Sequence, residues 1–245
     1  MRLILKVCIF SKVLFCIFIL SVTYSVYGYE LMSIYDIQFT MSPGFDGTYP
    51  SPFVNKQVIV QGVVTGVNFE NNRAFISEPQ GGKWSGIAID GISNKVSTGD
   101  FIEVYGKVSE IMGMTVITNV KKLKVLLQNA VLPEPTNVSC LEALSSEAYE
   151  AVLVKITNLT CHKSQSTNFV VAMEDNTGII DIGKGFMNSL NADYFTIEGQ
   201  YSYVVGIVNY AYNRFTIHPR TFSDIKPSSL SSPSTSWGRI KTLYR

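Results

Sequence analysis

Two stretches that repeat one another decide the fold: residues 99–117 (GDFIEVYGKVSEIMGMTVI) and residues 199–217 (GQYSYVVGIVNYAYNRFTI). At a constant offset of 100 residues, the same residue type recurs at five positions. Each stretch has a Gly inside an apolar run, where Gly usually marks a bulge or a tight bend of a strand. The repeated pairs are Gly99 and Gly199, Val104 and Val204, Gly106 and Gly206, Val108 and Val208, and Ile117 and Ile217.

Short apolar runs separated by polar turns precede both stretches, so each copy predicts five strands within about 70 residues. Five strands with a Gly inside one of them are typical of the OB-fold, a partly open barrel. We therefore predict an all-β protein of two tandem five-stranded OB-fold barrels with a short connecting helix at Leu141–Glu150, capped by Ser139. The other predicted strands are 58–64, 74–77, 86–89, 101–106 and 114–117 in the first copy, and 151–156, 169–173 and 178–181 in the second.

The N-terminus has the pattern of a secretory signal peptide. Three basic residues flank or precede the apolar run Val13–Leu20, and the small residue Gly28 ends the segment. An uncleaved anchor is the alternative, but this run is shorter than the ~20 residues of a membrane span. We expect a secreted, periplasmic or cell-surface protein without stable membrane insertion once the signal is removed. The expected segments are signal peptide 1–28, first OB-fold with a lead segment 29–127, connector 128–147, second OB-fold 148–226, Ser/Pro linker 227–236 and tail peptide 237–245.

The charge balance excludes a protein that coats nucleic acid without specificity, since such proteins are strongly basic. Loss of residues 1–28 removes three of the 20 Lys and Arg residues and none of the 19 Asp and Glu residues, which leaves a net charge of −2. Three more cations lie in the last nine residues, so residues 29–226 carry −5. Any contact with nucleic acid must therefore be local.

No catalytic pattern is present. The sequence contains neither HExxH, GxSxG, a phosphate-binding loop nor paired CxxC. His162 and His218 stand alone in the sequence, which is typical of surface or packing residues, and Asp residues such as Asp181 fall in turns or at strand ends. We expect a non-enzyme without a metal site or a cofactor.

Cys140 and Cys161 remain after the signal is removed. In an exported chain such a pair is a candidate disulfide, which would close a loop worth roughly 3 kcal/mol. Two separate buried thiols are the alternative.

The binding surface of an OB-fold lies across its second and third strands, between two flanking loops. Aromatic rings beside Lys or Arg on this surface would stack on bases while the cations contact phosphate. For Phe75 and Phe169 the alternation of strand residues favours the barrel core instead. The candidates are Phe69, Arg73, Phe75, Lys83 and Trp84, beside Met112 and Met114, in the first copy, and Lys163, Phe169, Tyr210, Tyr212 and Arg214 in the second.

Part of the chain resembles a known module. The segments Ile34–Gln38, Ser51–Val54 and Val60–Thr65, with the hairpin Phe75–Pro79 and Trp84–Ile87, resemble the OB-fold module that precedes exported bacterial endonuclease/exonuclease/phosphatase-type nucleases. The resemblance covers about residues 34–126, and residues 148–226 fit a more divergent second copy. Ser77 and Glu78 depart from the family pattern, and no nuclease domain is included. The resemblance implies a nucleic-acid-binding accessory role beside a separately encoded nuclease.

We therefore expect an exported, non-catalytic protein that binds single-stranded DNA or RNA. The alternative is an extracellular module that binds carbohydrate or protein, because aromatic platforms also hold sugars. After the Ser/Pro linker, the tail Trp237–Arg245 is expected to dock to a sorting or surface partner.

Overall fold

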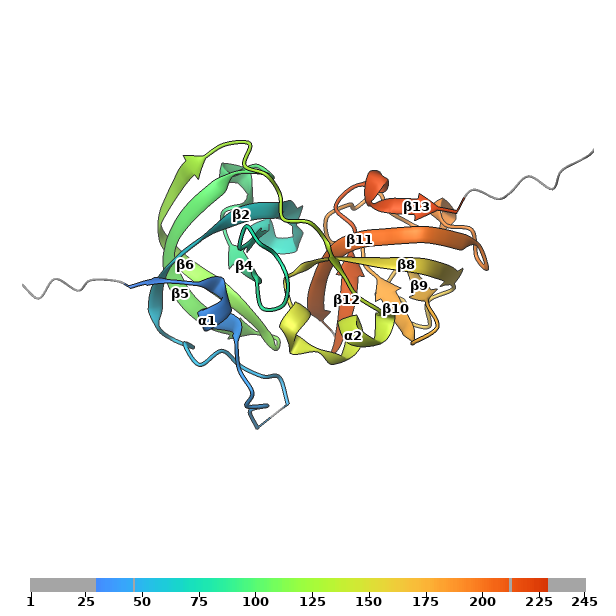
Figure 1. Cartoon of the computed structure of the whole chain (residues 1–245), viewed down its shortest axis with the longest axis horizontal. Helices are drawn as coiled ribbons and strands as arrows, with labels where there is room; N and C mark the ends of the chain where they lie inside the picture. Colours follow the sequence, from blue (N-terminus) through green and yellow to red (C-terminus); the bar gives the residue numbers. More distant parts are fainter. Residues whose placement is uncertain (1–29, 46, 212, 229–245) are drawn as a thin grey trace, which may run out of the picture.

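The computed structural model describes residues 30–45, 47–211 and 213–228. These residues form two closed five-stranded barrels of mixed strand direction that lie side by side, each around its own hydrophobic core (Figure 1). This confirms the predicted fold class. The predicted signal peptide, the tail 237–245 and most of the linker 227–236 lie outside the described residues.

In the first barrel, strand β2 pairs with both β3 and β5, and the circle closes through the parallel pair β4–β6. Alternate residues of β5 point inward, so Ile102, Val104 and Val108 are fully buried. A two-residue strand, β1, and a short helix, α1, precede the barrel and were not predicted. The bounds are β1 Leu31–Met32, α1 Ile34–Gln38, β2 Gln57–Phe69, β3 Arg73–Ser77, β4 Gly86–Asp90, β5 Phe101–Ile111 and β6 Met114–Leu127.

The second barrel repeats this topology, with β8 paired to β9 and β11 and with β10 parallel to β12. It too is preceded by a short parallel strand and a helix, β7 and α2. Ser139 caps α2 as predicted, but the helix ends at Ser145 and a single 3-10 turn follows. The bounds are β7 Thr136–Asn137, α2 Cys140–Ser145, β8 Leu153–His162, β9 Val171–Glu174, β10 Ile179–Ile182, β11 Gln200–Ala211, β12 Arg214–His218 and β13 Ile225–Pro227.

The glycine pair at the offset of 100 has the same structural cause in both barrels. A Cβ atom at Gly106 would lie 2.5 Å from Cγ2 of Ile117, and one at Gly206 would lie 2.5 Å from Cγ2 of Ile217. Both distances are shorter than any normal carbon contact. Only Gly therefore lets β5 pass this close to β6 in the first barrel, and β11 this close to β12 in the second. The sequence repeat therefore reflects a repeated packing constraint.

A third apolar cluster lies between the barrels and joins them. The first barrel contributes the end of β2 and the outer face of β3, β4 and β6, and the second contributes Ala151 and the outer face of β8 and β11. Arg220 of the second barrel also donates from Nη1 to the carbonyl oxygen of Thr65 in the first, at 3.1 Å. The buried members of this junction are Phe69, Phe75, Ala88, Met114, Val116, Ala151, Leu153, Val205 and Ile207.

Among the residues that the structure describes, no helix has both the length and the hydropathy needed to cross a lipid bilayer.

Candidate functional site

The face of the first barrel that an OB-fold offers to ligands is covered by the second barrel. Phe75 is completely buried, and its ring contacts the rings of Phe69 and Phe186 at centroid distances of 5.2 and 5.5 Å. Phe69 is also buried, against Phe186 and His218 of the second barrel. Neither phenylalanine exposes a ring to a ligand in this arrangement. Phe75 is buried, as the strand alternation favoured, but it lies in the junction and not in the barrel core. The reason is packing between barrels, which a strand pattern does not show.

Arg73 is also largely buried. Its side chain is 12% exposed and its Nε lies 2.7 Å from Oδ1 of Asp90, with Nη1 3.6 Å from the sulfur of Met114. An arginine that is paired and covered in this way is not placed to contact phosphate. Its role is to neutralise Asp90 at the edge of the junction.

Lys83 and Trp84 lie on the loop between β3 and β4, which contacts the segment before β8 beside the junction. The backbone N–H of Trp84 donates to the carbonyl oxygen of Ala148, at 2.7 Å. The Trp84 ring lies edge-on to Phe39, at 5.5 Å, and Nζ of Lys83 lies 5.5 Å from the ring centroid of Tyr149. Both side chains thus contact the segments that lead into each barrel, and their ligand contacts remain a prediction.

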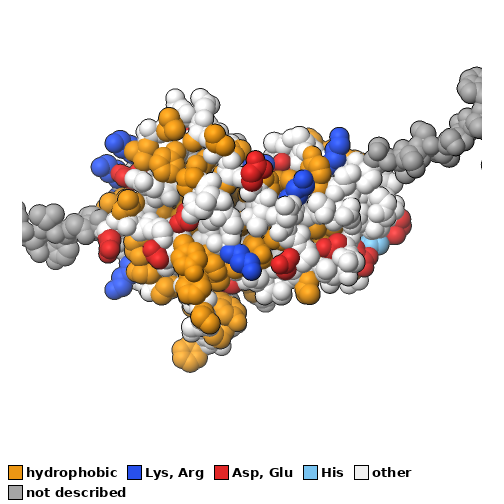
Figure 2. All heavy atoms as spheres, in the orientation of Figure 1, with side chains coloured by type: hydrophobic (Ala, Val, Ile, Leu, Met, Phe, Trp, Pro, Cys, Tyr) orange, Lys and Arg blue, Asp and Glu red, His pale blue; other side chains and the backbone are white. Residues whose placement is uncertain are grey.

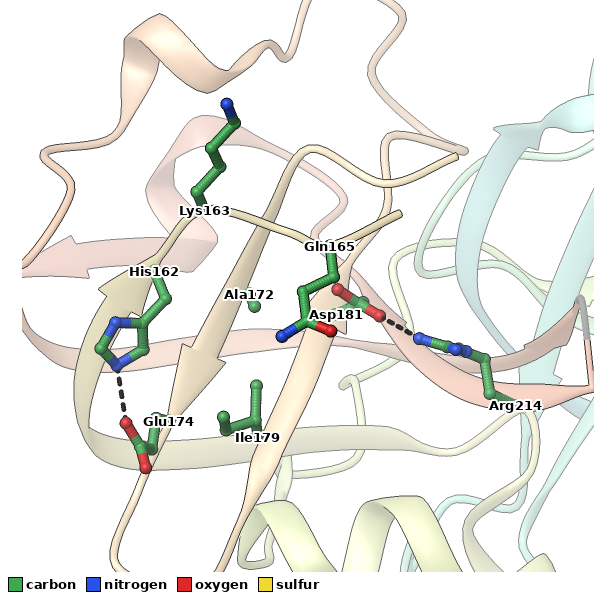
Figure 3. Close-up of a pocket in the computed structure, with 8 residues that line it drawn as sticks. All are labelled: His162, Lys163, Gln165, Ala172, Glu174, Ile179, Asp181 and Arg214. Atoms are coloured by element: carbon green, nitrogen blue, oxygen red, sulfur yellow. Dashed lines mark hydrogen bonds and ion pairs between the residues drawn. The ribbon is translucent and has the colours of Figure 1, made fainter. Parts of the chain in front are cut away.

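The same face of the second barrel is open and carries a cleft of about 470 Å³. Strands β9 and β10 form its floor, where Ala172 is buried and Ile179 is half exposed. Figure 3 shows Gln165 and Asp181 projecting above this floor, with His162 and Glu174 at one side and Arg214 at the other. The cleft is therefore apolar at its base and hydrogen-bonding around its rim.

Arg214 is held in place by a buried carboxylate. Its Nη1 lies 2.8 Å from Oδ2 of Asp181, and Oδ1 of Asp181 accepts a hydrogen bond from the hydroxyl of Ser164, also at 2.8 Å. The guanidinium carbon lies 6.0 Å from the ring centroid of Phe169. Half of the Arg214 side chain is exposed, and an arginine has five N–H donors. Several of these donors therefore face the solvent in a fixed position.

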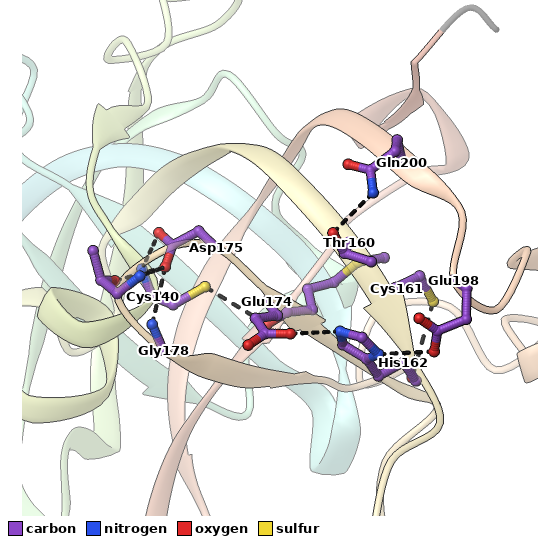
Figure 4. A network of polar contacts seen from close by, with 11 residues as sticks. Cys140, Thr160, Cys161, His162, Glu174, Asp175, Gly178, Glu198 and Gln200 are labelled. Atoms are coloured by element: carbon purple, nitrogen blue, oxygen red, sulfur yellow. Dashed lines mark hydrogen bonds and ion pairs between the residues drawn. The ribbon is translucent and has the colours of Figure 1, made fainter.

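His162 links three segments at the other side of the cleft. Its Nε2 lies 2.6 Å from Oε2 of Glu174 and its Nδ1 lies 3.0 Å from Oε1 of Glu198 (Figure 4). These hydrogen bonds, that to Glu198 first, raise the pKa of His162. The sequence placed His162 as an isolated residue, whereas the fold brings it two carboxylate partners.

Of the second-barrel candidates, Lys163 and Arg214 line this cleft, and the Phe169 ring lies next to Arg214 without lining it. Tyr210 lies elsewhere: it packs on Phe215 at 4.9 Å and beside Gly113 of the first barrel. Tyr212 lies outside the described residues. The residues that sequence reasoning missed are His162, Gln165, Glu174, Ile179 and Asp181. Pairing β10 with β12 in OB-fold order would have placed Asp181 beside Arg214.

The two cysteines are separate buried thiols, not a disulfide. Sγ of Cys140, on α2, donates to the carbonyl oxygen of Met173 at 3.6 Å, and Sγ of Cys161, on β8, donates to that of His162 at 3.9 Å (Figure 4). Burial raises the pKa of Cys140 to about 12 and that of Cys161 to about 11. Both sulfurs therefore act as small apolar groups of the second core, which is the alternative of two separate buried thiols.

His218 is buried where the second barrel meets Phe69. Its Nδ1 accepts from the N–H of Gly185 and its Nε2 contacts the hydroxyl of Thr216, each at 3.0 Å. Burial lowers the pKa of His218 to about 3, so the ring is neutral. Within the described ranges, no three His, Cys, Asp or Glu side chains are grouped to hold a metal ion.

No family model matches the chain, and no curated protein matches it. Solved structures similar to it include a murine DNA-binding protein bound with double-stranded DNA (10% identity, 70% of this chain and 98% of that chain, TM-score 0.37). The Ifi202 HINa domain in complex with 20-bp double-stranded DNA matches at 12% identity, over 72% of this chain and 98% of that chain, with a TM-score of 0.36. A chain described as an aspartyl-tRNA synthetase from Leishmania major Friedlin matches at 12% identity, over 45% of this chain and 23% of that one, with a TM-score of 0.29. Similarity at this level says nothing about the ligand of this chain.

Proposed function

We propose that this chain is an exported, non-catalytic nucleic-acid-binding protein, and that a single strand binds across β9 and β10 of its second barrel. The observation that carries the proposal is Arg214. It is fixed by Asp181, half exposed, and set above Phe169 on the only one of the two equivalent barrel faces that is open in the described chain.

The arrangement suits a nucleotide for two reasons. Lys163 and Arg214 provide two cations at the rim of the cleft for phosphate contacts, and Ile179 on its floor, with the Phe169 ring next to Arg214, provides apolar surface for a base. A base stacked on a ring contributes about 1–3 kcal/mol. Two cations make few phosphate contacts, which agrees with the net charge of −5 over residues 29–226. A role beside a separately encoded nuclease, as the resemblance implies, belongs to the same proposal.

The rim of the cleft also supports a second candidate, which is carbohydrate. Glu174 and Asp181 line the cleft together with the amide of Gln165, and carboxylates accept hydrogen bonds from sugar hydroxyls but repel phosphate. Salt dependence separates the two ligands, since phosphate contacts release counterions on binding and sugar contacts do not.

The test is binding of a labelled 20-mer of thymidine and of a glycan panel, measured by fluorescence anisotropy between 25 and 200 mM salt. Two phosphate contacts predict a slope of log K against log salt of about −1.4 for a single strand. Arg214→Gln should halve that slope, and Phe169→Ala should weaken binding at every salt concentration. Lys95→Gln, an exposed lysine of the first barrel, is the matched control and should change neither quantity. Salt-independent binding of a glycan, with none of the oligonucleotide, would favour the second candidate.

A further inference from the structure

The far end of the first barrel carries a charged and apolar strip that the proposed function does not use. The last part of β6 runs Lys121-Lys122-Leu123-Lys124-Val125-Leu126-Leu127. We define the lysine–leucine strip as the exposed members Lys121, Lys122, Lys124, Val125, Leu126 and Leu127. Figure 1 shows β5 and β6 at the end of the molecule away from β9 and β10, and Figure 2 shows Lys and Arg side chains at that end.

The register of the β5–β6 pair fixes which way the strip faces. Lys122 pairs with Tyr105 and Lys124 pairs with Glu103. Tyr105 and Glu103 alternate with the fully buried Ile102 and Val104, so they lie on the outer side of the barrel. Paired residues point to the same side of a sheet, so the two lysines face outward as well.

The strip has little to neutralise it. Glu103 is the one acidic residue in the part of β5 that pairs with the strip, and its Oε2 accepts a hydrogen bond from Gln61 at 2.8 Å. None of the three lysines forms an ion pair with another described residue. Nζ of Lys121 lies 5.6 Å from the ring centroid of Tyr105. Three cations thus stand together on a chain whose body is net acidic.

Exposed aliphatic side chains adjoin these cations. Leu127 is 58% exposed and Val131, in the loop that follows, is 88% exposed; Val125 and Leu126 are each 37% exposed. Large aliphatic groups left in water beside lysines match the two layers of an anionic bilayer surface, where cations meet headgroups and apolar side chains enter the acyl boundary. A phosphate backbone would satisfy only the lysines. The two rings paired with the strip, Phe101 and Tyr105, are both partly buried, and the hydroxyl of Tyr105 is covered, so neither offers a base a fully exposed face.

We propose that the lysine–leucine strip attaches the chain to an anionic lipid surface. The attachment is peripheral, because the strip belongs to a strand whose other side closes the barrel. Since the strip and the cleft of the second barrel lie at opposite ends, an attached chain presents its cleft away from the lipid.

The test is sedimentation of the full chain with vesicles of phosphatidylcholine alone or of phosphatidylcholine and phosphatidylglycerol at 3:1. Each lysine should contribute roughly fivefold to affinity for the anionic vesicles, so Lys121→Gln/Lys122→Gln/Lys124→Gln should lose about a hundredfold. Leu126→Ser/Leu127→Ser should weaken binding without changing its salt dependence. The matched control, Lys95→Gln/Lys184→Gln/Lys226→Gln, changes the net charge equally at exposed sites elsewhere and should bind as the unaltered chain does.

Residues 1–28 and the basic tail are the same in every variant, so differences between variants report on the strip alone. Circular dichroism and thermal melting check that the exposed substitutions leave the fold intact. Undiminished vesicle binding by the triple-lysine variant, or equal binding to both vesicle types, would overturn the proposal. So would a triple-lysine variant that loses oligonucleotide binding and keeps vesicle binding, since the strip would then be a nucleic-acid surface.

Discussion

The two barrels present equivalent faces with opposite character. In the first barrel, Phe75 on β3 pairs with Ala88 on β4, and Met114 begins β6 beside them. In the second, Ala172 pairs with Asp181, and Arg214 begins β12 at the offset of 100. The apolar set is buried under the neighbouring barrel, while the polar set lines the open cleft. The same face of the same barrel topology thus packs against a neighbouring barrel in the first copy and forms an open cleft in the second.

The other side of the junction shows the same contrast. Val205 and Ile207 on β11 are buried against the first barrel, whereas their counterparts on β5, Tyr105 and Lys107, are partly exposed. At these paired positions, the outer face is apolar in the strand that meets the neighbouring barrel and more polar in the strand that does not. This packing therefore stops at two barrels, and the outer faces at the two ends of the molecule stay free for ligands.

The largest effect is expected at the covered face. Phe75→Ala should lower the free energy of unfolding by about 3–5 kcal/mol, because it removes a fully buried ring and leaves a cavity between the barrels. Phe169→Ala, at the open cleft, should cost about 1 kcal/mol or less. Urea unfolding of both variants measures the difference. Equal losses would mean that the two faces do not differ in the way that the structure shows.

A second effect concerns the pH dependence of the junction. Glu147 and Glu150 lie there close to Glu110, and Oε1 of Glu150 accepts from the N–H of Thr115 of the first barrel at 2.9 Å. Burial, with the nearby Glu110, raises the pKa of Glu147 to about 8. Burial, with the nearby Glu147, also raises the pKa of Glu150.

A carboxyl with a raised pKa stays protonated in the folded chain after the unfolded chain has lost its proton. Its contribution to stability is therefore full below about pH 4.5 and is lost as the pH rises to about 8. We expect the free energy of unfolding to fall across this range by roughly 1 kcal/mol per pH unit for each of the two carboxyls that stays protonated in the folded chain. Urea titrations at pH 5, 6, 7 and 8 measure it, and Glu147→Gln/Glu150→Gln should flatten the profile. If stability falls as steeply with pH in the double variant as in the unaltered chain, the pH dependence comes from groups other than Glu147 and Glu150.

The repeat itself can be tested with matched substitutions. Gly106→Ala and Gly206→Ala each push a Cβ to 2.5 Å from an isoleucine Cγ2 and to 2.9 Å from a backbone oxygen, of Thr118 or His218. Such overpacking costs about 1–3 kcal/mol. Thermal unfolding should show equal losses in the two variants. A neutral result at one of them would show that the offset of 100 is not a shared packing constraint.

The fold could be predicted from the sequence because its determinants are local. Glycines within strands, polar turns and alternating apolar residues recur in both copies, and each depends on neighbours along the chain or in the next strand. The cap of α2 at Ser139 is local in the same way. The short strands β1 and β7 were missed because two residues carry no pattern.

The site could be predicted only in part, because it depends on how two remote surfaces meet. Phe69 and Phe75 have the residue type of a stacking platform, and only the apolar faces of β8 and β11 turn them into a junction. The repeat did hold a signal: at the offset of 100, Met114 stands where the second copy has Arg214. The strand register of the structure adds that Ala88 stands where the second barrel has Asp181. A loss of polar residues at the ligand face of one copy indicates that this face is covered.

The smallest effect on stability is expected from the hydrogen bonds of His162 with Glu174 and Glu198, which lie beside the open cleft and have no counterpart among the described residues of the first barrel. Glu174 pairs with the first residue of β10, and the residue in that place in the first barrel is Ser77, which has no histidine partner. The hydrogen bonds of His162 with Glu198 and Glu174 raise its pKa, so the protonated ring is favoured in the folded chain. This contribution is fully present below the ordinary pKa of 6.5 and is lost as the pH rises through the higher folded value. Because the three side chains are partly exposed, His162→Gln should cost less than about 1 kcal/mol at pH 5.5 and less again at pH 8.5. Urea midpoints at the two pH values measure it, with Lys95→Gln as an exposed control. A loss that is the same at both pH values would show that the imidazole contributes by packing and not by its charge.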